Sequence, residues 1–153
     1  MNVVPLRLQP GADLRLALEA WMGKQHEQAG CVLSAVGSLS AVQLRLAGQQ
    51  ESTTITGDLE ILSLSGTLSP DGVHLHVAVA DSRGTAIGGH LCAGSRVRTT
   101  AELVIGLLPE WSFCRELDPA TGYPELQITA RHQSSWTAVA APPADAPARP
   151  HQP

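Results

Sequence analysis

A segment near the N-terminus has the periodicity of an amphipathic helix. Its apolar residues recur at three- and four-residue spacing and form one stripe, made of Leu14, Ala17, Leu18, Trp21 and Met22. Asp13 stands in the first turn, where a carboxylate favours the helix dipole, and Gly30 is a stop signal. The pattern therefore predicts one helix over residues 12–29.

Most of the chain that follows alternates between apolar and polar residues, as half-buried strands do. Turn-forming residues such as Gly37-Ser38 and Asp81–Gly84 separate the runs. The expected strands cover 31–36, 42–46, 59–68, 73–80 and 97–107, with a short strand before His90 and a pair flanking 118–122. One main helix on a mainly antiparallel sheet is an α+β fold, arranged like an α/β sandwich.

Composition sets the boundary of the domain. Residues 138–153 contain six Ala and five Pro, so we expect a disordered Ala/Pro-rich tail after a single domain over residues 1–137. The formal net charge of the 153 residues is −4, and it stays −4 without the tail because nine basic and thirteen acidic residues remain. An acidic domain with a single lysine is not a generic nucleic-acid binder, which needs clustered Lys and Arg. A charged fraction of only 16% favours burial of some surface in an oligomer.

The chain shows no sign of export or of membrane insertion. The N-terminus lacks a basic segment followed by an apolar run, and no stretch reaches the roughly 18 apolar residues of a spanning helix. Cys31, Cys92 and Cys114 are odd in number and widely spaced, as in reduced cysteines of a cytoplasmic protein. These features predict a cytoplasmic protein without a membrane partner.

Three of the six histidines fall within 17 residues, at His74, His76 and His90. In the strand over 73–80, alternation turns the valines and Leu75 inward and places His74 and His76 side by side on the other face. A strand that returns beside this one could bring His90 to the same place. Three neutral imidazoles with a fourth position open would form a catalytic type of zinc site.

A simpler interpretation of these histidines stays open. An HxH pair without a fixed third ligand is a weak motif, and surface histidines also alternate by chance. Gly88-Gly89 is either an ordinary turn or a close approach of backbone to an ion or to a neighbouring segment. The remaining histidines, His26, His132 and His151, are interpreted as solvated.

Two groups of charged residues have alternatives as well. Arg96 and Arg98 share a strand face with Thr100 and Glu102, and we favour a solvated face with a weak ion pair over an anion-binding wall. Glu60 shares a strand face with Leu62 and Leu64 in the expected register, where a buried carboxylate needs a partner. It could pair with an arginine at an interface or act as an acid near the metal.

Several blocks of sequence together resemble one family. They are Gly57–Gly66, His74-Leu-His76, Ala80–Gly84, Gly88-Gly-His-Leu91 and Phe113–Leu126, with Gly11-Ala-Asp13 and Val36–Leu39 in support. They look like the bacterial branch of the PPC (plants and prokaryotes conserved) domain and cover about residues 3–130.

The resemblance implies a compact homotrimer with a mainly antiparallel sheet. It also implies a DNA-associated regulatory role, although the Arg-Gly-Arg-Pro core of an AT-hook is absent from this sequence. The fold is similar to that of acetolactate decarboxylase, and this similarity places a metal, zinc first, on His74, His76 and His90.

Three functions follow from these observations. The first is a trimeric binding module associated with DNA and carrying the metal. The second is a zinc-dependent enzyme, of lyase or hydrolase type, acting on a small polar molecule. The third is a structural role in which the histidines bond to one another or to water in a trimer interface.

Overall fold

The computed structural model describes residues 1–131. The expected domain end at residue 137, the tail over 138–153, and the assignments of His132 and His151 lie outside the described residues. No helix within residues 1–131 combines the length and the apolar character needed to cross a membrane.

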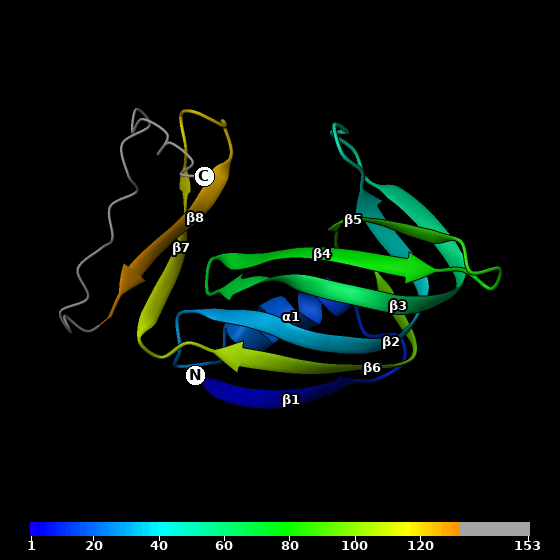
Figure 1. Ribbon diagram of the computed structural model, residues 1–153, viewed down its shortest axis with the longest axis horizontal. Coiled ribbons are helices and arrows are strands. Elements are labelled where there is room, and N and C mark those ends of the chain that lie inside the picture. Colours follow the sequence, from blue (N-terminus) through cyan, green and yellow to red (C-terminus); the bar gives the residue numbers. More distant parts are fainter. Residues whose placement is uncertain (132–153) are drawn as a thin grey trace, which may run out of the picture.

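Six strands form the main sheet in the order β1-β6-β2-β3-β4-β5 (Figure 1). Their bounds are β1 Asn2–Leu8, β2 Gly30–Arg45, β3 Thr53–Ser69, β4 Gly72–Ala80, β5 Ala86–Leu91 and β6 Arg96–Leu107. All neighbouring strands are antiparallel. The end of β2 also pairs with β5 through Leu44↔Leu91 and Arg45↔His90, so β2 to β5 close into a ring.

The helix α1, Leu14–Met22, packs against the sheet and completes the core (Figure 1). Leu14, Leu18 and Met22 are fully buried among the inward residues of the strands. The predicted α+β fold is thus confirmed. The apolar stripe is confirmed in part, because Ala17 and Trp21 are only half-buried.

The helix is shorter than the predicted range of 12–29 at both ends. Asp13 is its N-cap: one carboxylate oxygen accepts a hydrogen bond from the Leu16 N–H at 3.1 Å, and the other accepts one from the Gly94 N–H at 2.6 Å. Gly23, rather than Gly30, follows the last helical residue, and its N–H donates to Glu19. Gly30 instead opens β2.

Two strand predictions differ from the structure. Gly37-Ser38 is not a turn, because β2 runs through it with a register shift between Gly37 and Leu39. Gly37 has φ +140°, and a Cβ there would overlap the carbonyl oxygen of Thr100, so glycine allows a kink inside a continuous strand. The strand β1 was not predicted, since Pro5 interrupts its pattern; an edge strand tolerates proline because one of its sides is unpaired.

The outer face of the sheet carries the charged residues discussed above. Arg96 and Arg98 are exposed, and Arg98 Nε lies 2.9 Å from Asp58 Oδ1, which confirms a solvated face with a surface ion pair. Glu60 is exposed too. The expectation that it shares a face with Leu64 was wrong, because a bulge between Ile61 and Ser63 turns Leu64 inward.

The predicted final strand pair is present as the hairpin β7 Trp111–Leu117 and β8 Pro124–Ala130, a second, two-stranded sheet. Buried Phe113 anchors it, and the Phe113 N–H donates to the Gln28 carbonyl at 3.1 Å. The Arg115 N–H donates to Asp71 Oδ2 at 3.2 Å. The hairpin rises at one end of the sheet, and the β2–β3 connection rises at the other (Figure 1).

Candidate metal centre

The structure brings His74, His76 and His90 together. Leu75 and Val77 point into the core, so the alternation of β4 turns His74 and His76 outward, as predicted. The returning strand β5 places His90 directly opposite His76. The three imidazole centroids are 5.1, 5.1 and 5.7 Å apart.

Gly88 and Gly89 have a packing role in β5 rather than a turn role. A Cβ at Gly88 would come within 2.8 Å of the Val77 carbonyl oxygen, and one at Gly89 within 3.0 Å of the Arg45 carbonyl oxygen. The two glycines therefore let β5 approach both of its neighbours in the ring. This close pairing sets the position of His90.

The donor set fits a divalent metal ion such as zinc. One ligand nitrogen from each histidine lies within 4.8 Å of the other two. Two donors that share an ion through bonds of about 2 Å can be at most about 4 Å apart, so small rotations of the side chains bring all three into range. His74 and His76 are exposed enough for such rotations.

The surroundings keep two of the imidazoles neutral, which is the form that binds metal. Partial burial, followed by the charges of Arg45 and His74, lowers the pKa of His90 to about 4. Partial burial and then the Arg115 guanidinium lower the pKa of His74. Arg15 Nη1 also lies 3.5 Å from His90 Nε2, and because a guanidinium only donates, a hydrogen bond here needs the unprotonated form of this nitrogen.

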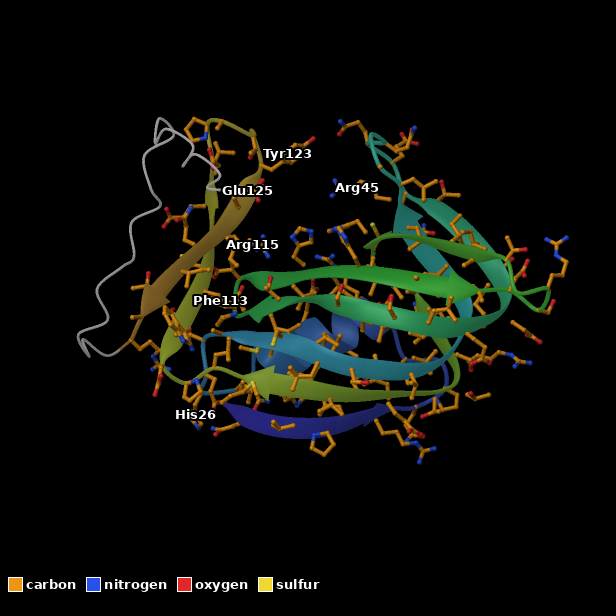
Figure 2. The ribbon with its side chains drawn as sticks, viewed as in Figure 1. His26, Arg45, Phe113, Arg115, Tyr123 and Glu125 are labelled. Atoms are coloured by element: carbon orange, nitrogen blue, oxygen red, sulfur yellow. The ribbon has the colours of Figure 1, made fainter. Side chains whose placement is uncertain are left out.

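A cavity of about 930 Å³ opens over the three histidines. The hairpin contributes Arg115, Tyr123 and Glu125, and the end of β2 with the following loop contributes residues 45–50. Figure 2 shows Arg115, Tyr123 and Glu125 on the hairpin side and Arg45 across from them. The volume is in the range of small-molecule sites, and the polar groups converge on the imidazoles.

Sequence reasoning found the histidines and missed the arginines around them. Arg15, Arg45 and Arg115 line the cavity, whereas Arg96, Arg98 and Glu60 do not. For Arg115 there was a signal, because it lies in the block 113–126 that carries the family resemblance. His26, interpreted as solvated, is exposed and lies away from the cavity (Figure 2).

Comparison with known proteins identifies the family. The sequence profile of the Plants and Prokaryotes Conserved (PCC) domain, the family called PPC above, matches residues 1–109. The chain belongs to the PCC domain family. This PCC domain is also 56% identical over 128 residues to the bifunctional protein GlmU of a Synechococcus strain. The matched residues make up 84% of this chain and 21% of that protein. The chain thus spans about a fifth of the length of the curated relatives that it matches.

Two solved structures resemble the PCC domain closely. A hypothetical protein from Salmonella is 44% identical with a TM-score of 0.83, over 86% of this chain and 95% of that chain. A protein from Archaeoglobus fulgidus described as metal-containing is 28% identical with a TM-score of 0.68, over 83% and 94% of the two chains.

Proposed function

We propose that the PCC domain binds a divalent metal ion, zinc first, through His74, His76 and His90 and uses it on a small polar molecule in the cavity. The convergence of three imidazoles from two adjacent strands on the wall of a cavity carries this proposal. The metal-containing relative from Archaeoglobus supports it. The expected reaction is of lyase or hydrolase type.

The chain would supply binding, orientation and a proton acceptor. When bound to three neutral imidazoles, zinc with an open position polarises a carbonyl or lowers the pKa of a bound water. Glu125 faces the cavity from the hairpin, and its charge offsets a part of the lowering of the His74 pKa by burial and Arg115. Its Oε1 accepts a hydrogen bond from Thr121 Oγ1 at 2.9 Å, which holds the carboxylate in place to accept a proton.

Metal analysis tests the proposal directly. After purification with zinc and removal of excess ion, we expect about one zinc per chain in the wild type. His76→Ala removes one of three ligands and is expected to leave less than about a tenth of that amount at the same free zinc. The matched control is His26→Ala, an exposed histidine outside the cavity, which should retain the wild-type content. A wild type without zinc, cobalt or manganese would refute the metal site.

Association with DNA remains a prediction of the family resemblance. The cavity mixes Arg115 and Arg45 with Asp71 and Glu125, a pattern that suits a small molecule better than a phosphate backbone. Gel-shift measurements on the purified protein at rising salt check this point. Retardation that weakens steeply with salt would support direct DNA binding, and none at low salt would exclude it.

We further propose that the domain forms a homotrimer through the outer face of its sheet. Val3, Leu33, Val36 and Leu62 are each about half exposed, on β1, β2 and β3, and the side chains of Met1 and Leu33 both lie next to Gly106 on the intervening β6. Light scattering should give about three times 16.1 kDa for the wild type. Val36→Glu is expected to shift the mass toward the monomer, and Leu16→Glu, at an exposed apolar residue of α1, should not. A monomeric wild type would contradict the proposal.

A further inference from the structure

The three arginines of the cavity differ in their partners. Arg15 already has partners within the protein: its Nε lies 2.9 Å from Glu19 Oε1, and its Nη1 donates to the Leu91 carbonyl at 2.9 Å. Arg115 Nη2 donates only to the neutral Thr67 hydroxyl at 3.0 Å. Within residues 1–131, neither Arg45 nor Arg115 has a carboxylate at ion-pair distance. Two guanidiniums therefore face the cavity without a charged partner.

These two arginines stand on either side of the histidines. Arg45 is directly opposite His90 in the β2–β5 pairing, and after burial its charge has the largest effect on the pKa of His90. Arg115 reaches over from the hairpin, and its charge has the corresponding effect on His74. Figure 2 shows the two side chains approaching the cavity from opposite sides.

The charges of the cavity residues indicate that an anion accompanies a bound metal ion. With Arg15 paired to Glu19, the remaining charged residues are Arg45 and Arg115 against Asp71 and Glu125, and these cancel. A divalent ion on the histidines then leaves two uncompensated positive charges beside the arginines. Repulsion between the metal ion and the two nearby guanidiniums disfavours binding of the metal unless an anion enters with it.

We propose that the cavity binds a small organic dianion, with one carboxylate or phosphate group at Arg45, the other at Arg115, and its middle facing the histidines. A planar guanidinium matches both kinds of group through paired hydrogen bonds. The inference deepens the proposed function, on which it rests for the role of the metal. It assigns the two arginines as specificity-determining residues.

Calorimetric titration of the zinc-loaded protein with four small molecules of similar length tests the inference. Succinate carries two carboxylates, 3-phosphonopropionate replaces one of them by a phosphonate, butyrate is a monoanion and succinamide is neutral. We expect both dianions to bind at least about tenfold more tightly than butyrate, because a charge-assisted hydrogen bond contributes that much. Succinamide should not bind measurably. The tighter of the two dianions tells whether the natural ligand carries carboxylates or a phosphate.

Substitutions assign the binding to the arginines. Arg45→Gln and Arg115→Gln are each expected to weaken the dianions at least about tenfold and to bring their affinity close to that of butyrate. Arg98→Gln is the matched control, because Arg98 is paired with Asp58 outside the cavity. Equal affinity for butyrate and succinate, or equal loss in all three variants, would overturn the inference.

The same titrations on metal-free protein separate this inference from the metal proposal. If the protein binds no metal but still binds dianions in a manner that depends on Arg45 and Arg115, the dianion site stands and the metal site falls. If zinc binds stoichiometrically and the dianions bind neither form, the metal site stands and the dianion site is refuted.

Discussion

Gly66→Ala is expected to lower the free energy of unfolding by about 3 kcal/mol or more, the largest loss expected from an alanine at any glycine of the domain. Gly66 pairs with Leu75 in the middle of β3 and β4 and has φ +149°. An alanine Cβ there would overlap the carbonyl oxygen of His74 and come within 2.9 Å of the Leu75 Cα. These are backbone atoms, so β4 itself would have to move.

Thermal unfolding measures this effect, and Gly57 offers a matched control. Gly57 has φ +143° in the same strand, but a Cβ there meets nothing within 4 Å. Gly57→Ala therefore carries the backbone strain without the collision and should cost only about 1 kcal/mol. We expect the Tm of Gly66→Ala to fall at least about 5 °C below that of Gly57→Ala. Equal Tm values would show that β4 can yield at no cost.

Zinc is expected to stabilise the domain by about 2.7 kcal/mol when its free concentration is 100 times its Kd. His76 and His90 face each other across β4 and β5, so an ion bound to both links the two strands in the folded state only. The Tm should rise by several degrees, and removal of the metal with a chelator should reverse the rise. His76→Ala should abolish the rise, whereas His26→Ala should keep it. A rise of the same size in His76→Ala would place the ion elsewhere.

The choice of pH matters for this measurement. The pKa of His90 is about 4 in the fold and about 6.5 in an unfolded chain, so between these values the unfolded state binds more protons. The metal-free domain therefore loses stability as the pH falls from about 6.5 to about 4. At pH 7 the imidazole is neutral in the fold, and the effect of zinc is measured without this contribution.

The site residues that could be predicted from the sequence are those placed by contacts between segments close together in the chain. Alternation along one strand was enough to put His74 and His76 on one face, and a short connection was enough to bring His90 beside them. Arg45 reaches the site through the pairing of β2 with β5, which closes the ring between residues far apart in sequence. No local sequence pattern predicts such a pairing.

The errors in the fold have the same origin. Gly37-Ser38 is a pair of turn-forming residues, but pairing with the neighbouring strand β6 keeps the chain extended there. The predicted helix extended past Gly23 to residue 29, yet the helix ends where its buried stripe ends, at Met22. In both places tertiary packing decided between conformations that the local sequence allows.

Two separate parts of the structure form the walls of the cavity: the strands β4 and β5 form one wall, and the hairpin β7–β8 forms the other. The histidines depend on the main sheet, whereas the opposite wall belongs to a separate two-stranded sheet held through Phe113, Thr67 and Asp71. Substitutions near the hairpin tip can therefore change what the cavity accepts without disturbing the strands that hold the imidazoles. In evolution, such a division lets one sheet with its three histidines acquire new ligands by exchanging a single loop.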